Sequence, residues 1–196
     1  MTEPMDKPLT GYEALLCLAG GIACYKVADL ASKLVQAGAG VTVAMTDAAT
    51  RFIAPLTFQT LTARRVYTSM WQSSEDFDAK HVSLTDRADL MILAPATANT
   101  IGKMAHGIAD DLVSALALSA TGACPILIAP AMNNRMWAAP AVQDNLATLK
   151  QRGICTVGPA EGRLACGAEG IGRMSEPAEI LAAASALLRK RPAKNL

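Results

Sequence analysis

Two uninterrupted apolar segments constrain the fold of this chain most strongly. Residues 89–94 read DLMILA and residues 125–129 read PILIA, and each segment is followed directly by a proline, Pro95 and Pro130. A strand with one solvated face alternates apolar and polar residues, whereas these segments are apolar at nearly every position, which is typical of strands covered on both faces. Because such strands occur in parallel sheets flanked by helices, the two segments predict an α/β fold.

The rest of the chain alternates between strand and helix patterns. The expected strands are residues 12–18, 40–45, 89–94, 125–129 and 154–157. The expected helices are residues 27–35, 46–62 with an interruption at Pro55, 97–120 with a break near Gly107, 141–152 and 175–189. We expect a short strand or turn and then an exposed loop over residues 64–80, and a mobile flap over the glycine-rich residues 158–172. This order predicts a single-domain doubly wound parallel sheet, Rossmann-like or flavodoxin-like, that binds ligands beyond the carboxyl ends of its strands.

The length of 196 residues accommodates one ordinary domain. We expect residues 12–190 to form it. Residues 1–11 are polar, lack the charged-then-apolar order of a signal peptide and are expected to be a flexible tail. Residues 191–196 are expected to be a basic tail or the start of a linker to a further domain.

Composition excludes several functional classes. Only 18% of the residues are charged and the net charge is +1, so no basic surface for nucleic acid is expected. Hydrophobic residues make up 52% of the chain without an apolar run of about 18 residues, which indicates a homo-oligomer rather than a membrane protein. Five cysteines without a C-x-x-C pair, together with two histidines, favour neither a disulfide framework nor a metal site. A cytoplasmic location follows as an expectation.

Unusual residues follow four of the expected strands and should meet in one pocket. They are Gly20-Gly21, Thr46, residues 95–99 and residues 130–133. A glycine pair before a helix lets backbone N–H groups approach an anion, but it is explained equally well as a turn. The third glycine of the dinucleotide motif G-x-G-x-x-G is missing, and Asp47 fits a helix cap as well as a ribose ligand, so a dinucleotide is disfavoured. Residues 96–100 could support a flat ring against the backbone, or they could simply cap the next helix.

Three separated motifs carry a resemblance to a known family. They are PATANT at residues 95–100, PAMNNRMW at residues 130–137 and ACGAEGIGRM at residues 165–174. In this order they resemble the homo-oligomeric flavin-containing cysteine decarboxylases, over about residues 15–177. Within that family the similarity is greatest to the members that decarboxylate 4'-phospho-N-pantothenoylcysteine in coenzyme A biosynthesis.

The resemblance implies an FMN cofactor and assigns site residues by position. Those implied in FMN binding are Gly20, Gly21, Ile22, Thr46, Phe52, Thr97, Ala98, Asn99, Thr100 and Ala131. Those implied in substrate binding are Asn133, Met136, Arg163 and Ala165, and those implied in catalysis are His81 and Cys166. The chain departs from the family pattern at Thr97, where serine is common, and at Ala168, where an acidic residue is common. Because of the second departure, the resemblance does not define which contacts the flap makes.

The implied chemistry explains why these residue types are needed. Loss of carbon dioxide from a cysteine carboxylate requires an electron sink, which oxidation of the thiol-bearing carbon to a thioaldehyde by FMN creates and re-reduction to 4'-phosphopantetheine removes. His81 would serve as base or proton relay, Cys166 would donate a proton from the flap, and the neutral amide of Asn133 would orient the carboxylate. Taken without the resemblance, the same residues fit a surface histidine, an exposed cysteine and a turn cap.

Three other functions share these features. A flavin prenyltransferase has the same fold but needs neither the 130–137 motif nor a flap cysteine. A peptide-cysteine oxidative decarboxylase would stop at the enethiol. A non-catalytic flavin-binding regulatory protein commonly adds long acidic extensions. The expected partners are further copies of the chain, as a trimer or a trimer-based dodecamer, and a fused or separate phosphopantothenoylcysteine ligase, with no nucleic acid and no membrane.

Overall fold

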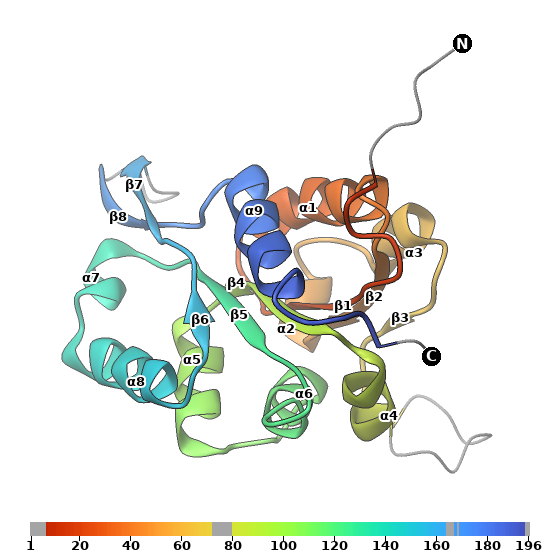
Figure 1. The fold of residues 1–196 in the computed structure, drawn as a ribbon. Helices are drawn as coiled ribbons and strands as arrows, with labels where there is room; N and C mark the ends of the chain where they lie inside the picture. The colour runs from red at the N-terminus through yellow and green to blue at the C-terminus, as the bar shows by residue number, and fades with distance from the viewer. Residues whose placement is uncertain (1–6, 72–79, 164–166, 168, 195–196) are drawn as a thin grey trace.

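The computed structural model describes residues 7–71, 80–163, 167 and 169–194, with the backbone only at residues 80 and 81. Its centre is a six-stranded parallel sheet in the order β3-β2-β1-β4-β5-β6 (Figure 1). The strands are β1 (Glu13–Leu18), β2 (Gly40–Met45), β3 (Val66–Tyr67), β4 (Leu90–Ala96), β5 (Ile126–Pro130) and β6 (Cys155–Thr156). A separate antiparallel hairpin pairs β7 (Ala160–Arg163) with β8 (Glu169–Arg173). The predicted doubly wound parallel sheet is thus confirmed.

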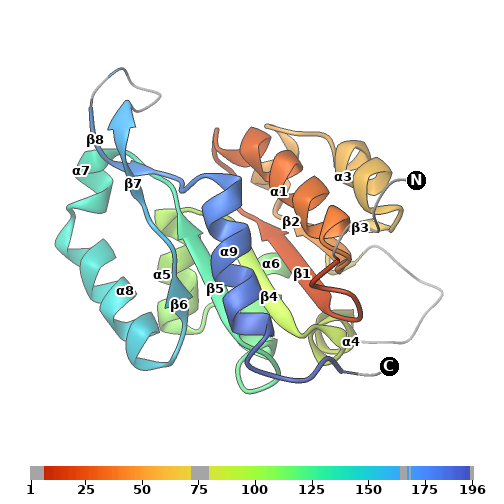
Figure 2. The same ribbon diagram turned by 45° about the horizontal axis from the view of Figure 1, so that its top comes forward.

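Helices cover both faces of the sheet (Figure 2). They are α1 (Cys24–Gln36), α2 (Asp47–Thr50), α3 (Pro55–Thr62), α4 (Lys80–Arg87), α5 (Ala98–His106), α6 (Leu112–Ser119), α7 (Asn134–Trp137), α8 (Pro140–Gln151) and α9 (Pro177–Leu188). Buried side chains of α1, α3 and α9 form one core cluster with the sheet, and those of α5, α6 and α8 form the second. Every residue of β4 and of β5 is buried, as the two apolar segments predict.

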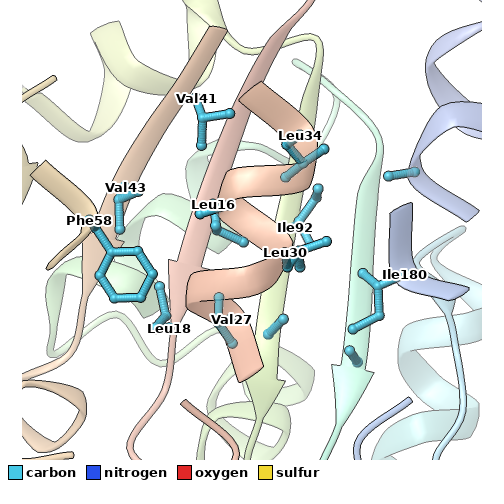
Figure 3. Close-up of a cluster of buried hydrophobic side chains, with 14 of the residues drawn as sticks. Leu16, Leu18, Val27, Leu30, Leu34, Val41, Val43, Phe58, Ile92 and Ile180 are labelled. Atoms are coloured by element: carbon cyan, nitrogen blue, oxygen red, sulfur yellow. The ribbon is translucent and has the colours of Figure 1, made fainter. Parts of the chain in front are cut away.

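The first core cluster shows how the sequence pattern becomes packing (Figure 3). Helix α1 carries apolar side chains at Val27, Leu30 and Leu34, which repeat at helical spacing and are fully buried. Beneath them, Leu16 on β1 and Ile92 on β4 contribute to the same cluster. Strand β1 alternates its faces, so that Leu16 enters this cluster while its sequence neighbours enter the other one.

Both ends of the described chain are held more firmly than the sequence predicts. Leu9 lies in the stretch expected to be a flexible tail, but it is buried, and its N–H donates to the Ala37 carbonyl at 2.8 Å. At the other end, Lys194 donates through Nζ to three backbone carbonyls and through its N–H to Asp89. Because these segments are mostly polar, the sequence did not indicate that buried Leu9 and hydrogen-bonded Lys194 attach them to the domain.

Three elements differ from the sequence expectations. The glycine-rich segment was expected to lack regular structure, yet it contains the β7–β8 hairpin, in which Gly162, Gly170 and Gly172 adopt φ of 147° to 156°. Glycine readily takes up this extended positive-φ conformation, so the glycines form the hairpin rather than prevent it. Helices α4 and α7 were also missed, because both are short and polar and present few apolar side chains at helical spacing.

Among the residues that the structure describes, no helix combines the length and apolarity needed to cross a bilayer.

Replacing Phe58 should destabilise the fold strongly, since it is fully buried on α3. We expect Phe58→Ala to lower the free energy of unfolding by about 3–5 kcal/mol, measured by urea denaturation. The matched control is Leu56→Ala on the same helix, where the side chain is 68% exposed and the expected change is under about 0.5 kcal/mol. Equal losses in the two variants would contradict this account of the core.

Adding a methyl group at Gly20 should also destabilise the protein. A Cβ there would overlap the Cβ of Ala48 on α2 and lie 2.8 Å from its carbonyl carbon, whereas a Cβ at Gly21 would meet nothing closer than Thr97 Cγ2 at 3.7 Å. We expect Gly20→Ala to lower the free energy of unfolding by about 1–3 kcal/mol, as overpacking typically does. Gly21→Ala should change it by less than about 0.5 kcal/mol in the same urea titration. If both variants unfold at the same urea concentration, α2 does not constrain the turn.

Candidate functional site

A large cleft lies beyond the carboxyl ends of the parallel strands. Strands β1 and β4 are neighbours at the centre of the sheet, and the chain leaves them toward opposite faces, into α1 and α5. This is the switch point at which α/β sheets bind ligands. The cleft has a volume of about 1470 Å³, more than one drug-sized ligand needs. The arrangement therefore has room for two small molecules side by side.

The first wall of the cleft is the turn between β1 and α1. Helix α1 begins without a side-chain cap, because its N-cap residue is Ala23. Among the described residues, the N–H groups of Ile22 and Ala23 find no backbone acceptor, whereas the Gly21 N–H hydrogen-bonds the Cys24 thiol. Free amides and the positive end of the dipole of a 13-residue helix favour an anion here. The absence of a side chain at Gly20 lets α2 pack directly against this turn.

Two threonines frame the neighbouring strand ends. Thr46 follows β2 and caps α2 by accepting a hydrogen bond from the Ala49 N–H at 3.1 Å. Thr97 follows β4 and caps α5 by accepting from the Thr100 N–H at 3.3 Å. Both threonines also line the cleft, so the capping and ligand-binding interpretations are compatible. Small side chains beside them leave an open surface against the backbone.

The opposite wall follows β5. Asn133 is the N-cap of α7, where its Oδ1 accepts a hydrogen bond from the Arg135 N–H at 2.8 Å. Asn133 and Met136 line the cleft next to Met132, whose N–H donates to the Gly172 carbonyl at 2.9 Å. A Cβ on Gly172 would overlap the Met132 carbonyl oxygen. This close approach fixes the β7–β8 hairpin on the wall that carries Asn133.

Charged side chains gather at the end of the cleft near α9. Lys26 Nζ lies 2.9 Å from Glu176 Oε1, and Arg173 Nη2 pairs with the same oxygen. The two cations hold the pKa of the Glu176 carboxyl below its ordinary value, Lys26 contributing most. Elsewhere in the cleft, Lys103 donates hydrogen bonds to the Asp110 and Asp111 carboxylates, which raise the pKa of its ammonium group.

Three of the buried cysteines are unreactive. Burial raises the pKa of Cys17, Cys24 and Cys124, so these thiols stay protonated at neutral pH. Cys24 donates from Sγ to the Ala19 carbonyl at 3.3 Å. Because Cys17, Cys124 and Cys155 lie in or beside apolar strand segments, the sequence predicts that all three are buried. The structure confirms this for Cys17 and Cys124, whereas Cys155 is only half-buried.

The structure brings most of the residues predicted for the site into this one cleft. They are Gly20, Gly21, Ile22, Thr46, Thr97, Ala98, Asn99, Thr100, Ala131, Asn133, Met136 and Arg163. Phe52 is not among them, because it follows the short α2 in a turn and its side chain is 51% exposed. The side chain of His81, together with Ala165 and Cys166, lies outside the described residues.

Sequence reasoning missed the charged residues of the cleft, namely Lys26, Asp29, Lys103, Asp111, Arg173 and Glu176. One signal could have revealed Lys26. A lysine in the first turn of a helix opposes the helix dipole, so it indicates a nearby anion. The other charges depend on tertiary contacts that no local pattern encodes.

Comparisons with known proteins agree with this geometry. The family model described as Flavoprotein matches residues 3–189. The coenzyme A biosynthesis bifunctional protein CoaBC of Bacillus subtilis is 51% identical over 173 residues, which are 88% of this chain and 42% of that protein. The chain thus spans less than half the length of such bifunctional relatives. A probable phosphopantothenoylcysteine decarboxylase of Streptococcus mutans is 42% identical over 83% of this chain and 90% of its own length.

Solved structures extend the likeness to three dimensions. A cysteine-to-serine variant of PPC decarboxylase, complexed with pantothenoylaminoethenethiol, superposes with a TM-score of 0.84 at 30% identity, covering 91% of this chain and 98% of that one. Other solved relatives are described as FMN-dependent cysteine decarboxylases and as an FMN-binding protein. Because the family model matches almost the whole length of this chain, the chain belongs to the flavoprotein family.

Proposed function

We propose that this chain binds FMN and decarboxylates 4'-phospho-N-pantothenoylcysteine to 4'-phosphopantetheine, a step of coenzyme A biosynthesis. One observation carries the proposal: the PATANT residues, the Asn133 loop and the root of the hairpin converge on one cleft at the switch point of the sheet. The relatives named as decarboxylases of this substrate support it.

The residues of the cleft fit FMN. The amides of Ile22 and Ala23 suit a single terminal phosphate, because they lie uncapped at the start of α1. The small residues Thr97 and Ala98 would hold the ring system, with Ala131 opposite. When bound, FMN supplies a reversible hydride acceptor.

The side chains of this chain would then orient the substrate and move protons. Asn133 would hold the cysteinyl carboxylate through a neutral amide, which positions the group without stabilising its charge against loss of carbon dioxide. Arg163 and Met136 would contact the substrate from the hairpin and from α7. His81 would accept the thiol proton, and Cys166 would donate a proton to the carbon from which carbon dioxide has left, which retains the electron pair of the broken bond.

The pantothenoyl substrate is favoured over a peptide ending in cysteine by one finding. The PPC decarboxylase variant was solved with pantothenoylaminoethenethiol, an unsaturated thiol that carries the pantothenoyl group. An ethenethiol is the species expected between loss of carbon dioxide and the final reduction. The same relative argues against a prenyltransferase, which would form no such thiol.

The proposal includes an assembly and a location. We propose a homo-oligomer, a trimer or a trimer-based dodecamer, because the cleft residues Ile22 and Tyr25 remain 60% and 62% exposed in the single chain. A phosphopantothenoylcysteine ligase, fused or separate, would supply the substrate, which the bifunctional relatives support. Coenzyme A biosynthesis places the proposed activity in the cytoplasm.

The direct test is the reaction itself. The purified chain should be yellow and should release carbon dioxide from 4'-phosphopantothenoylcysteine without added oxidant, forming one saturated thiol for each carbon dioxide, because the hydride removed is returned. Mass spectrometry of the thiol and a carbon dioxide assay measure this, with a peptide ending in cysteine as the comparison substrate. An unsaturated thiol as the only product would favour the oxidative decarboxylase, and flavin binding without release of carbon dioxide from either substrate would favour a regulatory protein.

A charge at position 133 should separate substrate binding from cofactor binding. We expect Asn133→Asp to retain FMN but to raise KM at least about tenfold, because it places a negative charge against the substrate carboxylate. Asn134→Asp is the matched control. It introduces the same charge at the adjacent residue, whose Oδ1 also accepts from the Arg135 N–H, but which does not line the cleft. Equal KM values for the two variants would remove Asn133 as the carboxylate ligand.

A further inference from the structure

Two cations from different elements share one carboxylate at the edge of the cleft. Lys26 comes from the first turn of α1, Arg173 from the last residue of β8, and Glu176 from the N-cap of α9. In the fold, β8 runs directly into α9, which packs beside α1 (Figure 2). Lys26 Nζ and Arg173 Nη2 both donate to Oε1 of Glu176. The group therefore joins the hairpin to the wall that begins with the α1 amides.

The charges at this position do not cancel. Two cations face one carboxylate, and the positive end of the α1 dipole adds to them. The other carboxylates that line the cleft on this side have cation partners of their own: Asp29 pairs with Lys33 at 2.5 Å and Asp47 with Arg51 at 3.3 Å. Glu179 does not line the cleft, and its carboxylate accepts from the Glu176 N–H. At the far side, Lys103 is balanced by Asp110 and Asp111. Arg163 on the hairpin adds a further cation to the cleft. The surplus of positive charge is therefore concentrated around Lys26 and Arg173.

Arg173 also has an unused donor. Its Nε is buried and, among the described residues, has no hydrogen-bond partner, although Nη2 is engaged by Glu176. A buried donor without an acceptor is unfavourable, and native proteins rarely leave one unless a ligand satisfies it. The Nε–H of Arg173 is a charge-assisted donor that can bind one phosphate oxygen while Nη2 stays on Glu176.

We infer that Lys26 and Arg173 form the subsite that binds the phosphate of the substrate, and that Glu176 positions both cations. The inference rests on the proposed function for the identity of the substrate. The ligand chemistry is a phosphate monoester, which FMN also carries. The uncapped amides of α1 already provide for the cofactor phosphate, so the second, side-chain site is assigned to the substrate.

The position of the subsite suits discrimination between phosphorylated and unphosphorylated substrates. The Lys26 side chain is 13% exposed, so it lies mostly out of solvent, where a charged contact is stronger than at a free surface. Arg173 follows Gly172, the residue fixed against the Met132 carbonyl. The guanidinium is thus attached at the rigid root of the hairpin, and a substrate without phosphate would leave its Nε unsatisfied.

The test compares phosphorylated and unphosphorylated ligands in the FMN-loaded protein. We expect Arg173→Gln and Lys26→Gln to raise KM for 4'-phosphopantothenoylcysteine by about 10- to 100-fold, the loss of one charged hydrogen bond, with little change in kcat. KM for pantothenoylcysteine should change less than about twofold, so the preference for the phosphorylated substrate collapses. Arg173→Lys, which retains the charge but loses the planar donor edge, should recover part of the preference.

The matched control is Lys190→Gln, which removes one exposed cation just after α9, outside the cleft, and should leave the preference unchanged. Far-UV circular dichroism and bound FMN report folding in each variant. Because Lys26 and Arg173 lie on different elements, the subsite can still be tested with one Gln variant if the other fails to fold. An unchanged preference in both folded variants would overturn the inference. So would a loss of affinity for FMN but not for riboflavin, because it would assign the two cations to the cofactor phosphate.

A binding measurement separates this inference from the proposed function. Titration calorimetry of the FMN-loaded protein with 4'-phosphopantothenate and with pantothenate requires no decarboxylation. A preference for the phosphorylated ligand that disappears in Arg173→Gln supports the subsite even if no carbon dioxide is released. Equal affinities for the two ligands in the parent protein would overturn it, even if the decarboxylase reaction is confirmed.

Discussion

Burial of the central strands on both faces is the constraint on which the rest of this structure depends. Strands β4 and β5 have no exposed residue, so each face of the sheet requires a layer of helices. Parallel pairing then forces every connection to cross back over a face, which brings the carboxyl ends of the strands to a single edge. The cleft is a geometric result of this arrangement, and the residues that follow each strand need only be chemically suitable to form a site there.

Backbone contacts define the walls of that cleft as much as side chains do. The β1–α1 turn packs against α2 at Gly20, and the hairpin packs against the Asn133 loop at Gly172. At both positions a side chain would occupy the space of a neighbouring backbone. Asn133 and Arg173, two polar residues that line the cleft, are therefore mounted on segments whose separation is fixed by contact rather than by flexible reach.

Much of the fold could be predicted because its signals are local. Continuous apolar runs marked β4 and β5, apolar spacing marked α1, and Pro177 marked the start of α9. The cleft could be predicted in outline, since parallel topology brings strand ends together whatever their sequence. The β7–β8 hairpin could not, because its glycines are also typical of a loop. Only the contact with Met132 in the folded protein shows why β8 needs a glycine at position 172. The Lys26–Glu176–Arg173 group joins residues 150 positions apart, a relation without any local signature.

The hydrogen bonds of Lys194 fix the edge of the sheet at which a further polypeptide or a tag could be joined to the domain. Its ammonium group bridges carbonyls of Asp86, Ala88 and Ala123, all of which precede strands, and Tyr12 Oη donates to the Arg191 carbonyl nearby. The chain therefore passes residue 194 at the amino edge of the sheet, on the side opposite the cleft. A tag, a surface linkage or another polypeptide joined after this point would start from the back of the molecule, leaving the mouth of the cleft facing outward.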